Sequence, residues 1–284
     1  DNMGGLAFGW QESGYLSAMV GTANEQTAYI SNFWRNQYDE IQRANQVIRR
    51  VPGMPIDDAI KKPVVAEAKF LRALHYAELI SYFGGVPLYD EAVDLNADFN
   101  DLKNPRSTIE EVRAFIVKDL TEAIADLPVA WPQADYGRAT KGAAFALRGK
   151  VYLYAKDWQK AIADFEEIVY NKSNSYGYAL YPKYADLFKL TGHKSNEMIF
   201  SVQTLAGVGL EYGIPFAYYM GFRGSFGGGN FSIPTTELAD SYENKDGSKF
   251  NWNDFIPKFN EDNAVKRKAF WATHTNGKLT SIPD

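Results

Sequence analysis

With 284 residues, the chain is long enough to bury a large core in one or two domains. Hydrophobic residues make up 45% of it and charged residues 23%, proportions that exclude an intrinsically disordered chain. The net charge of −5 argues against a nucleic-acid-binding protein, which would usually present a basic face. Because the sequence contains no cysteine, disulfides, thiolate metal sites and cysteine nucleophiles are excluded as well.

Residues 1–31 are interpreted as a loop-rich N-terminal segment, because glycines interrupt any hydrophobic periodicity there. They lack the basic start and apolar core of a signal peptide. No apolar run in the sequence approaches the roughly 20 residues of a membrane span. The first residues also do not resemble a natural N-terminus. We therefore expect the chain to begin inside a longer precursor, which could have carried a secretion signal.

Residues 32–170 are predicted to form a scaffold of helices arranged mostly as antiparallel hairpins. The first helix begins at Asn32 and ends before Pro52, since proline cannot continue a helix. The second helix has Pro63 in its first turn, a favoured place for proline, and Gly84–Gly85 end it.

The third helix is predicted over residues 108–127, behind a capping box. In this box the Ser107 hydroxyl and the Glu110 carboxylate each accept a hydrogen bond from a free backbone N–H group. A loop with Trp131 and Tyr136 follows the helix. Either aromatic side chain could belong to the core or to a binding surface.

Residues 137–170 are predicted to form two helices joined by a short turn, with Thr140 and Asp157 as their N-caps. Their small and aromatic residues follow the spacing of a tetratricopeptide repeat, a hairpin that is stable only when stacked on neighbours. The residues that carry this spacing are Gly149, Tyr152, Ala161 and Phe165. Arg148 stands where the repeat usually has leucine, so this is a variant unit.

Residues 171–284 have a different character. Short helices are predicted in YADLFKL and PTTELADSYE, and a strand in MIFSVQ, while residues 205–230 are rich in glycine and aromatic residues. The fold class is therefore predicted as mainly α. Tetratricopeptide-like hairpins over 32–170 would be followed by a loop-rich, partly β region over 171–284, in which we expect ligand binding.

Three long stretches of the sequence resemble the signatures of the SusD/RagB family. They are AEAKFLRALHYAELISYFGGVPLYDEA, NPRSTIEEVRAFIVKDLTEAIADLP and GRATKGAAFALRGKVYLYAKDWQKAIADFEEIV, and they occur in the order typical of the family. The segments YADLF, EMIFSVQ and PTTELADSYENKDG are similar to later parts of it. Family members usually continue well beyond NAVKRKAFWATHTNG, a segment that matches only loosely. We therefore expect the chain to be incomplete at its C-terminus too.

The resemblance implies a nutrient-binding lipoprotein on the outer surface of a Bacteroidetes-type cell. Such proteins bind an oligosaccharide, or in some members a peptide. They deliver it to a SusC-like TonB-dependent transporter in the outer membrane. Membrane association would rest on a lipid anchor at an N-terminal cysteine, which is not present in this sequence. No ligand residue of the family can be matched to a motif here, so none is transferred.

The residues themselves argue against an enzyme. His75, His193 and His274 are isolated and show no metal-binding spacing. Adjacent carboxylates such as Glu110 and Glu111 are neighbours on a helix, whereas the two carboxylates of a glycosidase face each other across a cleft of about 5 to 10 Å. We therefore assign no catalytic residue, no metal ligand and no cofactor.

Two segments combine aromatic and polar side chains, as a sugar-binding surface requires. Burying the C–H face of a sugar on Trp or Tyr contributes roughly 25 cal/mol per Å², and the sugar hydroxyls need polar partners. The predicted ligand-binding residues are Trp10, Gln11, Tyr15, Tyr218, Tyr219 and Arg223. For each of them, a place in the core is an equal alternative. A peptide binder in the same uptake system and a tetratricopeptide protein-interaction adaptor are the competing functions.

Overall fold

The computed structural model describes residues 21–93, 103–170, 175–189, 192, 194–203, 238 and 241–249, and the backbone of residues 7–8 and 233–234. The chain forms two compact units. One consists of Ile30–Gly213, which we call the helical unit, and the other of Asp1–Tyr29 with Ile214–Asp284. In the second unit, strand β1 (Ala7–Phe8) pairs antiparallel with β2 (Ile233–Pro234), and Glu243 and Lys249 form an isolated bridge.

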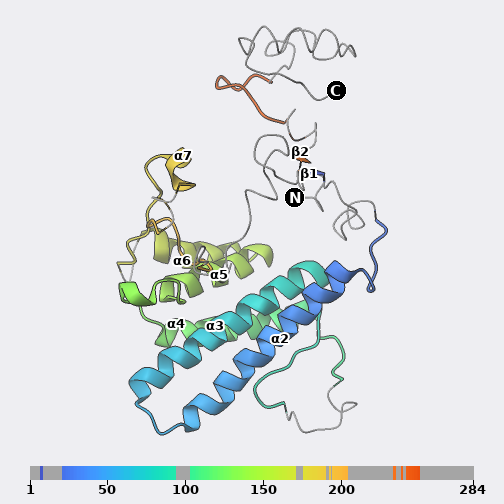
Figure 1. Ribbon diagram of the computed structural model, residues 1–284, viewed down its shortest axis with the longest axis vertical. Coiled ribbons are helices and arrows are strands. Elements are labelled where there is room, and N and C mark those ends of the chain that lie inside the picture. Colours follow the sequence, from blue (N-terminus) through green and yellow to red (C-terminus); the bar gives the residue numbers. More distant parts are fainter. Residues whose placement is uncertain are drawn as a thin grey trace, which may run out of the picture. The chain divides into compact units, whose positions relative to one another are not determined.

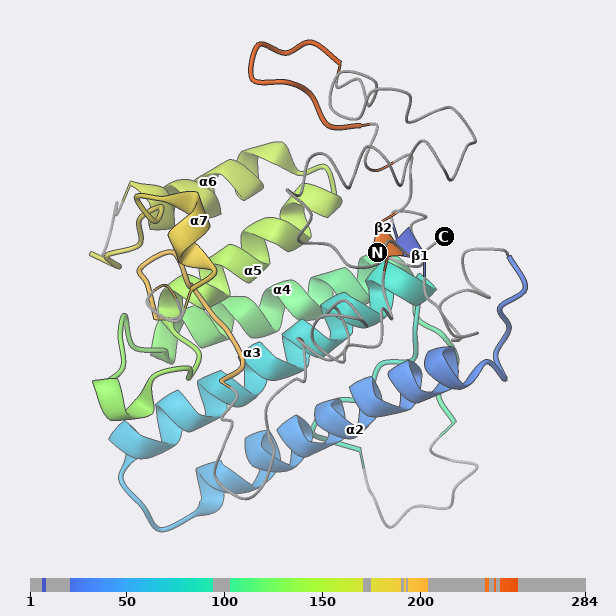
Figure 2. The same cartoon turned by 45° about the horizontal axis from the view of Figure 1, so that its top comes forward.

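Helices dominate the described part of the chain, as the sequence predicts. The α-helices are α2 (Ala28–Arg50), α3 (Asp58–Phe83), α4 (Ile109–Asp126), α5 (Lys141–Tyr154), α6 (Trp158–Val169) and α7 (Tyr184–Leu187). Short 3-10 helices are η2 (Val51–Gly53) and η3 (Gln133–Asp135). Helices α2 to α6 lie side by side in sequence order, and successive helices run antiparallel (Figures 1 and 2).

The hairpin of α5 and α6 confirms the predicted repeat. The Thr140 hydroxyl accepts a hydrogen bond from Ala143 N, and the Asp157 carboxylate caps α6. A Cβ atom on Gly149 would lie only 2.8 Å from the Phe165 ring, so glycine is what allows the two helices to approach. Arg148, at the variant position, donates two hydrogen bonds to the Asp164 carboxylate of α6, at 2.8 and 2.7 Å.

The capping box of α4 lies one residue later than predicted. Thr108, not Ser107, is the N-cap: its hydroxyl accepts a hydrogen bond from Glu111 N, and its own N–H donates to the Glu111 carboxylate. Both registers fit the sequence STIEE equally well. Tertiary structure decides between them, because Ser107 N donates to Val86 O at 3.0 Å and holds Ser107 in the preceding extended segment.

Helix α3 begins earlier than predicted, which places Pro63 inside the helix and not in its first turn. Asp57 is the N-cap, with its carboxylate accepting a hydrogen bond from Ala59 N at 2.8 Å. Asp58 then pairs with Lys61 at 2.7 Å. These polar contacts stabilise a first turn that lies before Pro63, although the preference of proline for the first turn predicts a later start of the helix. At the other end, Gly84 adopts φ +70° and closes the helix, as predicted.

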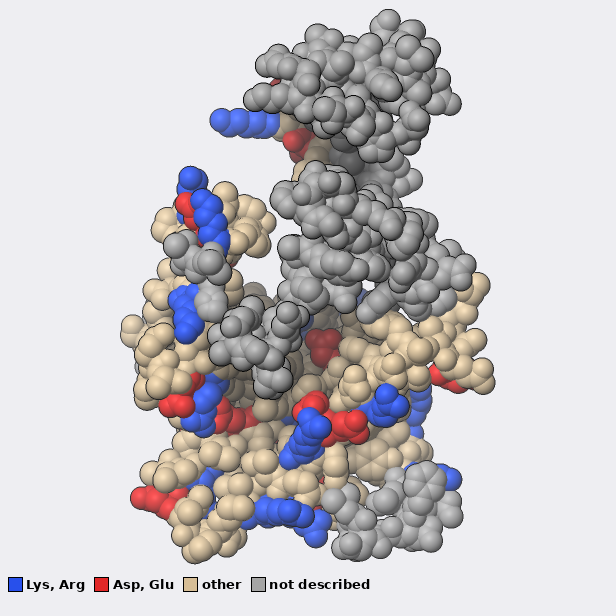
Figure 3. All heavy atoms as spheres, in the orientation of Figure 1, with Lys and Arg blue, Asp and Glu red and all other residues tan. Residues whose placement is uncertain are grey.

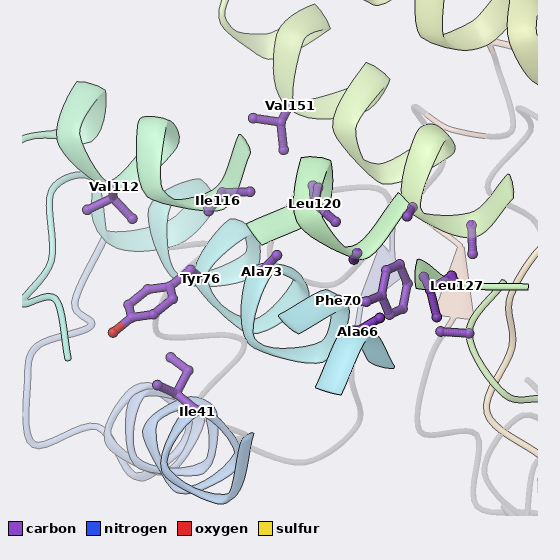
Figure 4. Packing of buried hydrophobic residues seen from close by; sticks show 14 of the residues in the cluster. Ile41, Ala66, Phe70, Ala73, Tyr76, Val112, Ile116, Leu120, Leu127 and Val151 are labelled. Carbon is purple, nitrogen blue, oxygen red and sulfur yellow. The ribbon is translucent and has the colours of Figure 1, made fainter. Parts of the chain in front are cut away.

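The core of the helical unit lies between α3, α4 and α5 (Figure 4). Small core residues allow the helices to pack closely, and large ones fill the remaining space. The core includes Ala66, Phe70, Ala73, Tyr76, Val112, Ile116, Leu120 and Val151. Helix α2 contributes Ile41 and packs on α3 through large rings, such as Trp34 against Phe83 with centroids 4.9 Å apart. Apolar burial of this extent is the main source of stability.

One further expectation from the sequence is wrong. MIFSVQ does not form a strand, because Ile199 and Phe200 pack their side chains against the helical core and Phe70 lies edge-on to the Phe200 ring. Trp158, at the start of α6, is 55% exposed. The short helix in YADLFKL is confirmed as α7, while residues 235–237, 239 and 240 of PTTELADSYE lie outside the described residues.

Candidate functional site

The six predicted ligand-binding residues, Trp10, Gln11, Tyr15, Tyr218, Tyr219 and Arg223, all lie outside the described residues. Their assignment stays a prediction. The division of the chain into 1–31, 32–170 and 171–284 also stays one. The described residues nevertheless contain a cavity of the kind that these predictions require.

This cavity, which we call the aromatic pocket, has a volume of about 210 Å³ and lies within the helical unit. Three segments form it: residues 129–140, 176–178 and 194–201. Its aromatic walls are Trp131, Tyr136, Tyr176, Tyr178 and Phe200. Its polar side chains are Arg138, Thr140, Lys194, Ser195, Asn196 and Ser201.

The segment between α4 and α5 holds the first wall in place. Trp131 donates its indole N–H to Ala139 O at 2.6 Å, and the Arg138 guanidinium lies 3.6 Å from the centre of its ring. Gly137 adopts φ +102°, a backbone conformation that favours glycine, at the turn between these contacts. The indole is therefore fixed on both its edge and one face.

Arg138 connects this segment to α3 by an ion pair. Its guanidinium donates to both carboxylate oxygens of Glu67, once at 3.0 Å and once through a shorter contact. The hydrogen bonds with Glu67 raise the pKa of Arg138, against the opposing effect of burial. Because Glu67 and the nearby Asp135 balance its charge, Arg138 serves mainly to position Trp131.

The second wall consists of Tyr176 and Tyr178, whose rings are parallel within 3° and have centroids 5.9 Å apart. The Tyr178 hydroxyl lies 3.0 Å from the Thr140 hydroxyl, the same group that caps α5. Burial raises the pKa of Tyr178. Gly142 makes room for this ring, since a Cβ atom there would lie 2.6 Å from it.

The third side of the pocket is a turn that contains Lys194, Ser195 and Asn196. Ala179 N donates to Asn196 O at 3.2 Å and fixes the turn against the tyrosine segment. The Lys194 ammonium lies 5.0 Å from the centre of the Tyr136 ring. The Ser195 hydroxyl oxygen is buried and has no hydrogen-bond partner among the described residues. A buried polar atom of this kind usually pairs with water or ligand.

Other polar clusters in the described residues are structural. Arg72 is 2% exposed and donates to Asp119, Asn45 and Glu91, so its hydrogen-bonding capacity is used internally. His75 Nδ1 lies 2.6 Å from the Gln37 side-chain oxygen. No group of three or more His, Cys, Asp or Glu side chains among the residues described could hold a metal ion.

A second cavity, of about 410 Å³, lies against α3, α4 and α5 and is lined mainly by aliphatic side chains. Leu74, Ile80 and Leu147 are typical of its walls, and Tyr154 is the one aromatic residue among the described residues that line it. It therefore lacks the combination of stacked rings and polar groups found in the aromatic pocket. On the face drawn in Figure 3, basic and acidic side chains are interspersed over the helical unit and form no large patch of one sign.

Comparison with known proteins supplies the family. The family model described as "Starch-binding associating with outer membrane" matches residues 2–153, more than half of the chain. The chain belongs to the SusD-like family. A curated relative, SusD-like protein P25 of Formosa agariphila, is 29% identical over 192 residues, which cover 66% of this chain and 34% of the relative. The chain thus spans about a third of that relative's length.

Solved structures of SusD-like proteins share the fold. A SusD-like carbohydrate-binding protein from Bacteroides fragilis superimposes with a TM-score of 0.74 and 28% identity, over 88% of this chain and 47% of that one. A laminarin-binding SusD-like protein has a TM-score of 0.63 and 30% identity, over 70% and 44% of the two chains. The predicted family and mainly α fold are confirmed. SusD-like proteins bind carbohydrate and are associated with the outer membrane.

The described part of the chain contains no helix both long and apolar enough to cross a membrane.

The sequence leaves Trp131 and Tyr136 open between the core and a binding surface, and the structure places both in the aromatic pocket. Tyr176, Tyr178 and Ser195 also line the pocket but were not among the residues predicted from the sequence. The alternate spacing of the two tyrosines could have indicated a shared face, but nothing local brings the turn at Ser195 to them.

Proposed function

We propose that this protein binds oligosaccharides at the cell surface, without catalytic activity, and delivers them to a SusC-like TonB-dependent transporter. Its membership of a family described as starch-binding supports this function, as does its likeness to a solved protein described as laminarin-binding. The aromatic pocket is the observation in the molecule itself that carries the proposal.

The chemistry of the pocket suits a sugar. A pyranose has apolar C–H faces that pack on aromatic rings, and hydroxyls at its edge that need hydrogen-bond partners. Tyr136 and Tyr176 provide rings in the pocket walls, while Ser195 and Asn196 provide a hydroxyl and an amide beside them. None of the described residues that line the pocket is Asp or Glu, so they do not include the carboxylate pair that glycoside hydrolysis requires.

We propose further that the loops around Trp10 and Tyr218 provide the main recognition surface for longer chains. Calorimetry with a panel of soluble oligosaccharides and of mixed peptides tests this idea. We expect saturable binding to an oligosaccharide, lost in Trp10→Ala and in Tyr218→Ala while the folded state is retained.

Matched controls are Trp158→Ala and Tyr184→Ala, which remove aromatic side chains that are 55% and 76% exposed outside the aromatic pocket. Binding unchanged in all four variants would remove the loop site. Binding to peptides alone would replace the oligosaccharide function with peptide capture.

Delivery to a transporter and lipid anchoring require a separate experiment. The full-length protein, expressed in its native cell, would be purified from detergent-solubilised outer membranes. Co-purification of a large β-barrel transporter supports delivery. Recovery without such a partner, under conditions that preserve other membrane complexes, contradicts it.

A further inference from the structure

The aromatic pocket is lined by residues other than the predicted ligand-binding ones. All of its lining residues belong to the helical unit, between positions 129 and 201, whereas the predicted ligand residues fall between 10 and 15 and between 218 and 223. Helix α3 supports it through the Glu67–Arg138 pair, and α5 supports it through Thr140 and Tyr178. It is thus a site that described residues of the helical unit build and support.

The size of the pocket limits its ligand. Pockets for drug-sized molecules have volumes of roughly 300 to 1,000 Å³, and this one has about 210 Å³. A single sugar ring fits this space better than the middle of a long chain. The end of a chain, or a single-ring branch, would therefore enter it.

One polar atom of the pocket has no hydrogen-bond partner in the part of the chain that the structure describes. The buried Ser195 hydroxyl makes no hydrogen bond within the described residues, although leaving a buried polar group unpaired is unfavourable. The hydroxyls of the second wall are occupied: Tyr178 contacts Thr140, and Tyr176 donates to Glu167 at 3.4 Å. The oxygen is not solvent-accessible in its present rotamer, but a rotation about the Ser195 Cα–Cβ bond breaks no hydrogen bond to a described residue and would present the hydroxyl to a bound sugar.

The charges around the pocket favour an acidic ligand. Among the described residues that line it, Arg138 and Lys194 are cationic and none carries a carboxylate. Glu67 and Asp135 balance the charge of Arg138. The Lys194 ammonium has no carboxylate within 4.0 Å among the described residues and is held over the Tyr136 ring. Lys194 is exposed to solvent, and an anionic group on the ligand would pair with its ammonium at the rim of the pocket.

We propose that the aromatic pocket binds one terminal sugar residue that carries a carboxylate, that is, a uronic acid. Lys194 pairs with its carboxylate, Ser195 hydrogen-bonds to a hydroxyl, and the aromatic walls contact the ring. This inference deepens the proposed function, since it depends on the ligand being a carbohydrate.

The test compares methyl β-glucuronide with methyl β-glucoside by NMR titration of the 284-residue chain. Ligands of this size bind with dissociation constants in the millimolar range. We expect the glucuronide to bind about fivefold more tightly, the size of effect that a partly exposed ion pair produces. Raising the salt concentration should reduce this preference.

Three variants identify the residues responsible. Lys194→Met should abolish the preference for the glucuronide, whereas Lys150→Met should leave it intact, because Lys150 also lies over a tyrosine, Tyr154, but does not line the aromatic pocket. Ser195→Ala should weaken binding of both glycosides about fivefold. The resistance of Ser195→Ala to urea should not fall, because the hydroxyl makes no hydrogen bond to a described residue that the substitution would remove.

Each contrary outcome is decisive. Equal affinity for the two glycosides, or a preference that persists in Lys194→Met, overturns the assignment to acidic sugars. No binding of either glycoside, or full affinity in Ser195→Ala, overturns the pocket as a sugar site. If longer oligosaccharides still bind in a manner sensitive to Trp10→Ala, only this inference fails and the proposed function stands.

Discussion

Arg72 on α3 and Asp119 on α4 form a buried two-point ion pair, with N–O distances of 2.7 and 2.8 Å. Both side chains are almost fully buried, at 2% and 1% exposure. Burial alone would lower the pKa of Arg72, but its hydrogen bonds with Asp119 and Glu91 outweigh that effect and raise it. The guanidinium therefore stays charged and joins α3 and α4 to Asn45 of α2.

Replacing one partner of this pair should be strongly destabilising. Arg72→Met leaves the Asp119 carboxylate buried without its counter-charge, so we expect the free energy of unfolding to fall by about 3 to 5 kcal/mol. Urea denaturation measures the change. The double variant Arg72→Met/Asp119→Leu should recover most of the loss, because it removes both charges.

The control for this prediction is Arg43→Met. Arg43 pairs with Glu40 at the surface, with side-chain exposures of 74% and 42%, so its loss should change stability by less than about 1 kcal/mol. If Arg72→Met were as mild as Arg43→Met, the buried pair would not be the link between the helices.

Gly149 should tolerate no side chain, because α5 and α6 meet at this position. A Cβ atom there would lie 2.8 Å from the Phe165 ring and 3.2 Å from Asp164 Cβ. We expect Gly149→Ala to destabilise the protein by about 1 to 3 kcal/mol, although alanine favours a helix over glycine by about 1 kcal/mol.

A matched substitution at another glycine separates the steric overlap with Phe165 from the general effect of replacing glycine by alanine. Gly53→Ala should be nearly neutral, since a Cβ atom on Gly53 has no neighbour within 4 Å. Thermal unfolding of the two variants side by side provides the comparison. A Gly149→Ala variant more stable than the unmodified chain would show that the hairpin can widen at little cost.

The position of the α4 cap gives a third prediction, in which the sequence and the structure disagree. The structure places the capping hydroxyl on Thr108, so Thr108→Ala should lower the free energy of unfolding by about 1 kcal/mol. Ser107→Ala should have little effect, because the contact of Ser107 with Val86 uses its backbone N–H. The reverse order of effects, measured by urea denaturation, would restore the register predicted from the sequence.

The fourth prediction concerns pH. Burial lowers the pKa of His75 below its ordinary value of 6.5, against a smaller opposing effect of Glu40. Between the folded-state pKa and 6.5 the unfolded chain binds more protons than the folded one, so this residue makes stability fall as the pH decreases below about 6.5.

His75→Gln should remove that contribution. The free energy of unfolding of His75→Gln, relative to that of the unmodified chain, should therefore rise as the pH falls from 7.5 to 5.5. Urea denaturation of both proteins at several pH values would measure this difference. A difference that stays constant over this range would show that His75 keeps its ordinary pKa in the folded protein.

The sequence by itself determined the helices and the family. Hydrophobic periodicity, caps at Thr140 and Asp157, and the glycine stop at Gly84 act over a few residues, so they can be read locally. The spacing of Gly149 and Phe165 also predicted a contact between neighbouring helices. Such signals are reliable because each one concerns residues that are close along the chain.

Only the tertiary structure decided the features that join distant segments. The choice of Thr108 over Ser107 depends on Val86, the packing of Phe200 in place of a strand depends on Phe70, and the aromatic pocket needs the turn at Ser195. Burial and hydrogen-bond satisfaction are properties of the assembled fold. Residues far apart in sequence determine them together, and no local pattern records that pairing.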